Sequence, residues 1–175
     1  MNKTIIPILL VLTFICSCSQ KNESASYWLD KEKTLWDGGK YTDPEKAIEY
    51  LNHALKLKQN DAELYNKRGL AYYDLGQYQR AIDDNTEAIR LRPYYFFAYN
   101  NRSVAYGKSG QYQLAIEDCN MVIRLKPYLA QSYINRGTVY LLQFNNKMGC
   151  SDYKKACDLG DCKTLKQAER KGFCR

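Results

Sequence analysis

Apolar, aromatic and small residues recur along most of this chain with a spacing of 34 residues. The two clearest copies are identical at 17 of 34 positions without a gap: residues 62–95 and 96–129. Gly76 and Gly110 stand near the middle of the copies, where a tight turn is expected. Pro93 and Pro127 stand near their ends, where a helix must stop because proline cannot continue it. Each copy is therefore predicted to be two helices joined by a turn.

The repeated positions carry residues of matching size. Aromatic residues occupy positions 4, 11 and 17, and small residues occupy positions 8 and 20, as in this list: Tyr65/Tyr99, Tyr72/Tyr106, Tyr78/Tyr112, Gly69/Ser103, Ala81/Ala115. Small residues let two helices approach closely, and aromatic rings fill the space between neighbouring hairpins. This pattern resembles the tetratricopeptide repeat. The resemblance implies an all-α fold, an alpha-alpha superhelix of four helix-turn-helix repeats with a C-terminal capping helix, nine helices in all.

The chain divides into seven segments on this basis. They are a signal peptide (1–17), a lipidated cysteine with its tether (18–24), a degenerate first repeat (25–61), the second repeat (62–95), the third (96–129), a degenerate fourth (130–161) and a capping helix (162–175). The first repeat holds three extra residues, for which we expect a longer turn with Asp43 capping the next helix. In the fourth, Phe144 replaces the turn glycine and Asp161 replaces the proline.

The first residues are typical of a secretory signal. Lys3 precedes eleven mainly apolar residues, 5–15, which are too few for a membrane-spanning helix of about 20. The following Ile15-Cys16-Ser17-Cys18 resembles a bacterial lipobox and predicts acylation of Cys18. The alternative is ordinary signal cleavage, which would leave a soluble periplasmic protein. Because Ser19 rather than Asp follows Cys18, we expect an envelope protein at the outer membrane facing the periplasm, with surface display as the alternative.

Composition removes several classes of function. The net charge of +7 does not predict nucleic-acid binding, since Lys and Arg alternate with Asp and Glu along most of the chain. The chain has a single histidine, His53, which excludes a two-histidine metal or catalytic site. No nucleophile–base pair, phosphate loop or metal cluster stands out. We therefore expect no enzyme activity, no cofactor, no metal and no small-molecule substrate.

Arginine recurs at position 7 and aspartate at position 23 of the last three repeats: Arg68/Asp84, Arg102/Asp118, Arg136/Asp152. We expect each pair to join the two helices of a repeat. The alternative is a row of arginines that receives carboxylates.

In the tetratricopeptide family the inner groove is lined by positions 2, 5, 9, 12 and 13 of the first helix. The resemblance therefore implies this set of partner-binding residues: Asn66, Leu70, Tyr73, Phe97, Asn100, Lys108 and Ile134. Beside them lie Asp74, Val104, Gln131, Thr138 and Leu141. Amides and aromatic rings suit an extended peptide. A two-lysine carboxylate clamp is not expected, because only Lys33 and Lys108 are placed for it. In the aromatic run 94–97, Tyr95 and Phe97 are expected to reach the surface.

Five cysteines remain after the signal region. Cys119 occupies a core position and is expected to be buried. Four others crowd the last 26 residues: Cys150, Cys157, Cys162 and Cys174. An oxidising compartment favours disulfides there. In an antiparallel pair of helices, residues with similar index sums are neighbours, which predicts Cys157–Cys162 and Cys150–Cys174. The segment around Cys157 is also similar to Sel1-like repeats, which carry helix-to-helix disulfides.

The sequence thus predicts an envelope-anchored scaffold that binds a partner protein or peptide in its concave groove. Two alternatives stay open: a subunit of an outer-membrane or pilus secretin assembly machine, and a passive stabiliser of a peptidoglycan enzyme complex.

Overall fold

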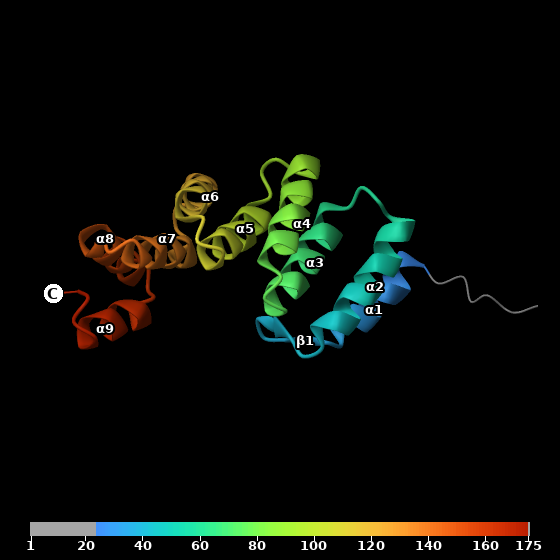
Figure 1. Cartoon of the computed structure of the whole chain (residues 1–175), viewed down its shortest axis with the longest axis horizontal. Coiled ribbons are helices and arrows are strands. Elements are labelled where there is room, and N and C mark those ends of the chain that lie inside the picture. Colours follow the sequence, from blue (N-terminus) through green and yellow to red (C-terminus); the bar gives the residue numbers. More distant parts are fainter. Residues whose placement is uncertain (1–23, 175) are drawn as a thin grey trace, which may run out of the picture.

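A computed structural model describes residues 24–174. Their elements, in order, are α1 (Ala25–Lys33), β1 (Trp36–Asp37), β2 (Lys40–Tyr41), α2 (Pro44–Leu57), α3 (Ala62–Asp74), α4 (Tyr78–Leu91), α5 (Phe96–Lys108), α6 (Tyr112–Leu125), α7 (Ala130–Leu142), α8 (Asn146–Asp158) and α9 (Lys163–Arg170). Successive helices pack as antiparallel pairs that follow one another along the molecule (Figure 1). The predicted all-α superhelix is confirmed. The signal segment and Cys18 lie outside the described residues.

Small residues bring the two helices of a repeat into close contact. A Cβ atom added to Gly69 on α3 would lie 2.6 Å from Asn85 Nδ2 on α4. One added to Gly137 on α7 would lie 2.9 Å from the carbonyl oxygen of Gly149 on α8. Since real Cβ atoms do not approach other atoms so closely, larger residues would force these helices apart. The small positions of the repeat therefore set the spacing of each hairpin.

Each repeat completes the core of its neighbour. Ala62 at the start of α3, Ala88 in α4 and Ala98 in α5 form one buried cluster. Ala81 and Ile82 of α4 form another with Ala105 of α5. Because these clusters cross repeat boundaries, a single repeat cannot bury its own apolar surface, and stacking is what stabilises the solenoid.

The first repeat has the longer turn that its sequence predicts. This turn contains a short antiparallel hairpin, in which β1 pairs with β2 and Trp36 lies opposite Tyr41. The hairpin turns at Gly38 and Gly39, both of which have positive φ. Asp43 caps α2 as predicted, since its side chain accepts a hydrogen bond of 3.0 Å from the Lys46 backbone N–H.

The turn of the fourth repeat keeps the backbone geometry of the others without their glycine. Gly76 and Gly110 have φ of 72° and 80°, and Phe144 has φ of 59° with 94% of its surface exposed. A left-handed conformation costs about 1–2 kcal/mol for a residue with a side chain. Phe144 therefore destabilises the turn of the fourth repeat relative to a glycine at the same position.

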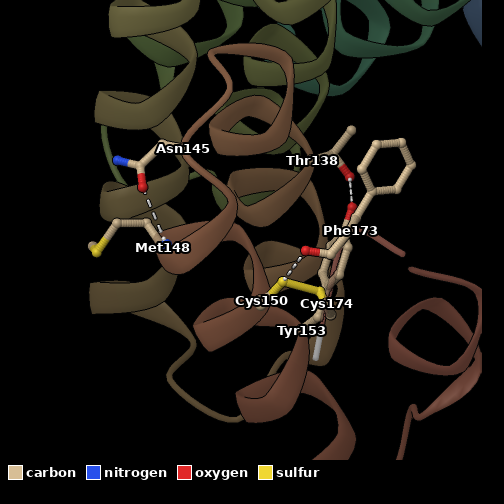
Figure 2. The surroundings of a disulfide bond; sticks show 7 residues. All are labelled: Thr138, Asn145, Met148, Cys150, Tyr153, Phe173 and Cys174. Atoms are coloured by element: carbon tan, nitrogen blue, oxygen red, sulfur yellow. Dashed lines mark hydrogen bonds between the residues drawn. A yellow bond between two sulfur atoms is a disulfide. The ribbon is translucent and has the colours of Figure 1, made fainter. Parts of the chain in front are cut away.

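Two disulfides hold the C-terminal end. Helix α9 buries only Ala168, so its own packing on α8 is small. In the structure Cys150 is bonded to Cys174 and Cys157 to Cys162, with Cα–Cα distances of 5.5 and 4.0 Å. Figure 2 shows the first bridge close to Phe173 and Tyr153, with the Tyr153 hydroxyl directed toward Thr138. These are the pairs expected from the sequence, and Cys119 is free and buried.

Replacing Cys150 and Cys174 together by serine is expected to lower the free energy of unfolding by about 3 kcal/mol, because this bridge constrains a long loop of the unfolded chain. The matched control replaces Cys157 and Cys162 together by serine. The Cys157–Cys162 bridge joins residues only five positions apart, so its loss should lower the free energy of unfolding by less. Urea denaturation measures both. Non-reducing peptide mapping that found Cys150 bonded to Cys157, or four free thiols, would contradict the pairing.

Candidate functional site

Three arginines tie the helices of successive repeats together. Arg102 on α5 donates two hydrogen bonds of 2.8 Å to the carboxylate of Asp118 on α6. A third, from Nη1, goes to Thr86 Oγ1 on α4, in the preceding repeat. The same arrangement recurs at Arg68 with Asp84 and Asn52, and at Arg136 with Asp152 and Asn120. The structural role expected for the Arg–Asp pairs is confirmed, and the carboxylate-receptor alternative is wrong.

These ion pairs are largely removed from water. Burial raises the pKa of Asp84 and Asp118, and hydrogen bonds from the facing guanidinium groups oppose that rise. The hydrogen bond to Asp84 raises the pKa of Arg68. Each carboxylate thus depends on its arginine for compensation, since an isolated buried charge is strongly destabilising.

The first helices of the repeats, α3, α5 and α7, carry the predicted partner-binding residues. Phe97 and Lys108 on α5 are exposed, and Leu70, Tyr73, Asn100 and Ile134 are half-buried. Tyr73 packs against the cluster of Ala81, Ile82 and Ala105, and burial raises the pKa of its hydroxyl. In the aromatic run, Phe97 is exposed as expected and Tyr95 is half-buried, while Tyr94 is the most exposed ring.

Asn66 is largely buried between α3 and α4. It is only 7% exposed, and its Nδ2 donates a hydrogen bond of 2.7 Å to Asn85 Oδ1 on α4. The amide of Asn85 in turn donates to the Ala81 carbonyl. The amide nitrogen of Asn66 is thus engaged inside the second repeat, and a role for Asn66 in partner binding stays a prediction.

Asn100 belongs to a chain of amides that crosses from α5 to α7. Its Oδ1 accepts a hydrogen bond of 2.9 Å from Asn135 Nδ2, and Asn135 Oδ1 accepts one of 2.8 Å from Gln131 Nε2. The amides predicted for the groove thus also hold adjacent first helices in register.

A hollow of about 210 Å³ lies between α5 and α7. Its walls come from both helices: Ser103, Val104, Gly107, Lys108, Asn135, Thr138, Val139 and Leu142. The lining is mostly apolar, and Lys108 and Asn135 supply polar atoms. Val104, Thr138 and Lys108 were placed on the concave face from the sequence. Leu142 and Asn135 were not in the predicted set, although the 34-residue spacing relates Lys108 to Leu142.

A second hollow, of about 260 Å³, lies between the first two repeats and is lined by Lys33, Trp36, Tyr41, Asn66, Lys67 and Leu70. Its floor is a buried network that sequence reasoning missed. Glu32 is fully buried and accepts hydrogen bonds from the Tyr41 hydroxyl and from Lys67 Nζ, the latter at 3.0 Å. Burial and Glu32 raise the pKa of Tyr41 far above its usual range. Since Glu32 stands at position 8, where the other repeats have Gly or Ser, that substitution was the available signal.

The comparisons with known proteins place these elements in a family. Models described as tetratricopeptide repeat match residues 62–95 and 98–128, and one described as TPR repeat matches 37–76. The chain contains tetratricopeptide repeats. No curated protein sequence matches it.

Solved tetratricopeptide structures superpose on most of the chain. MamA is 27% identical over 87% of this chain and 84% of its own, with a TM-score of 0.71. MamA from Desulfovibrio magneticus RS-1 is 28% identical over 85% and 86%, with a TM-score of 0.72. The first TPR of Spaghetti (RPAP3) bound to an HSP90 peptide is 25% identical over 63% and 89%, with a TM-score of 0.60.

Arg102→Ala and Asp118→Ala should each destabilise the tetratricopeptide fold, with a coupling of about 0.5–3 kcal/mol in a double-mutant cycle measured by urea denaturation. Arg102→Lys keeps the charge but loses the bidentate hydrogen bonding to Asp118, so the stability of this variant should lie between those of the wild type and Arg102→Ala. Additive single effects would show that the two side chains do not stabilise the fold as a pair. Loss of partner capture at unchanged stability would assign Arg102 to binding.

Proposed function

We propose that this protein is a non-catalytic scaffold whose concave surface, formed by α3, α5 and α7, holds an extended segment of a partner protein. The observation that carries the proposal is the apolar hollow between α5 and α7 with Lys108 and Asn135 as its polar groups. The TPR domain of Spaghetti, which is similar in fold, is bound to a peptide in its solved structure.

The hollow suits a side chain rather than a free small molecule. Its volume of about 210 Å³ is below the range of about 300–1,000 Å³ that is usual for ligand pockets. An apolar side chain of the partner would pack against Val104, Val139 and Leu142. Lys108 and Asn135 would then bond a carboxylate or backbone carbonyl nearby.

The lysines at the second hollow already have acidic partners within the protein, so this hollow offers a partner mainly apolar contacts. Lys67 is committed to buried Glu32, and Lys33 forms an exposed ion pair with Asp30. Trp36 and Leu70 remain as its apolar contacts. A segment that runs across the first helices would therefore place its charged group at Lys108 and apolar groups toward the first repeat.

Site-specific photo-cross-linking tests the groove. A photoreactive phenylalanine analogue at Leu142 should capture a discrete partner in intact envelopes, because Leu142 is an exposed wall of the hollow. The matched site is Leu114 on α6, which is similarly exposed but lies on a second helix. Adding Lys108→Ala should reduce the Leu142 product. Capture from Leu114 and not from Leu142 would show that the partner binds the outer surface.

We further propose that acyl chains on Cys18 anchor the scaffold in the bacterial envelope, at the outer membrane facing the periplasm. The support is the lipobox-like Ile15-Cys16-Ser17-Cys18 after a short apolar stretch. No helix within residues 24–174 is long and apolar enough to cross a membrane. Buried acyl methylenes each contribute about 0.8 kcal/mol to such an attachment.

Cys18→Ser should abolish fatty-acid labelling of the protein, because the acyl acceptor is lost. The experiment compares labelling of the wild type, the variant and a Cys16→Ser control, which should label normally. Labelling of the Cys18→Ser variant, or an unlabelled wild type, would rule out this anchor.

A further inference from the structure

The connections between repeats bring basic and aromatic side chains to one edge of the solenoid. Each of α2, α4 and α6 ends with two basic residues at a spacing of 34: Lys56 and Lys58, Arg90 and Arg92, Arg124 and Lys126. Two tyrosines at the same spacing follow, Tyr94 and Tyr128, which are 77% and 85% exposed. We call Lys58, Arg92, Tyr94, Lys126 and Tyr128 the loop edge.

The loop edge carries an excess of positive charge. Residues 90–97 and 124–131 contain four basic residues and neither Asp nor Glu. Acidic groups near these residues are Glu87, which pairs with Arg90, and Asp61 and Glu63 at the start of α3, which act on Tyr95. Asp61 is engaged as the cap of α3. Basic residues stabilise helix C-termini, but this effect does not account for two tyrosines that leave most of their surface in water.

The described chain begins at the same edge. Ala25, the first residue of α1, packs with Ala54 and Leu55 in the last part of α2. In the same way, Ala62 and Ala98 at the starts of α3 and α5 pack with Ala88 of α4. In Figure 1 the α2–α3 and α4–α5 connections lie along the upper side, and the β1–β2 hairpin lies on the lower side. The N-terminal end of the described chain is therefore close to the loop edge.

We propose that the loop edge lies on an anionic membrane surface and orients the solenoid along it. This inference rests on the proposed acylation of Cys18. Seven residue steps separate Cys18 from Ala25, and such a stretch spans at most about 24 Å when fully extended. An anchor at Cys18 thus keeps the start of α1 within that distance of the bilayer.

The chemistry of the loop edge fits that surface. Lysine and arginine side chains are attracted to anionic headgroups. Tyrosine prefers the membrane–water interface, where its ring contacts apolar groups and its hydroxyl stays hydrated. Because both residue types lie on the connections, the concave row of α3, α5 and α7 stays accessible to a partner while the edge rests on the membrane.

Vesicle flotation tests the loop edge without the acyl group. The chain from Ser19 to Arg175 contains the whole described fold, and circular dichroism checks that each variant is folded. The vesicles contain phosphatidylethanolamine with phosphatidylglycerol, or phosphatidylcholine alone. The wild type should float with the anionic vesicles only, and should be released in 1 M salt, where the Debye length is about 3 Å.

Arg92→Glu with Lys126→Glu should lower the vesicle partition coefficient by about tenfold or more. The matched control is Arg80→Glu with Lys147→Glu, which changes the net charge equally at exposed sites near the starts of α4 and α8, on the opposite edge. It should retain most of the binding. Tyr94→Ser with Tyr128→Ser should weaken binding several-fold at unchanged charge.

Three results would overturn the proposal: no binding of the wild type to anionic vesicles, equal binding to neutral vesicles, or equal losses in the loop-edge and control variants. The anchor is read separately by fatty-acid labelling. A labelled Cys18 together with failed flotation would refute the loop edge alone. An unlabelled Cys18 together with successful flotation would refute the anchor and support the loop edge as the attachment.

Discussion

The guanidinium group that joins three helices is the contact on which the rest of this solenoid depends. Each arginine of the row Arg68, Arg102 and Arg136 reaches an aspartate on the second helix of its own repeat and a polar side chain on the second helix before it. It therefore fixes the angle within a hairpin and the step to the previous hairpin together. Since the aspartates are buried, a repeat that shifts loses both hydrogen bonds and leaves a charge uncompensated.

This constraint determines what the concave surface can do. With the second helices held in place, the first helices α5 and α7 stand far enough apart to leave a hollow, and the amides of Asn100 and Asn135 bridge them beside it. In the second and fourth repeats the distance between the two helices is set by Gly69 and Gly137, which leave no room for a side chain. Exposed groove residues such as Lys108 and Leu142 can then vary without disturbing the packing, whereas Asn100 and Asn135 contribute to both the groove and the packing.

Much of this arrangement can be predicted from the sequence because the residues that make a contact in one repeat recur at the same positions in the others. Arginine and aspartate separated by 16 residues in three copies indicated the ion pairs before any geometry was known. The cysteine pairs followed from the antiparallel order of the last helices. The features that the sequence did not predict each occur in one repeat only, so no repeated pattern indicates them. They are the β1–β2 hairpin, the buried Glu32 beneath it, and the hydrogen bond of Asn66 to Asn85. Asn66 and Asn100 share a position, yet they differ because position 24 carries Asn85 in one repeat and Cys119 in the next.

We propose that the row of first helices, and not the second helices, receives the partner. Amide hydrogen exchange on the protein with and without the partner captured from its own envelope measures this directly. We expect slowed exchange in α5 and α7, strongest around Lys108 and Leu142, with α4 and α6 unchanged. Protection confined to α4 and α6 would show that the partner binds the second helices instead.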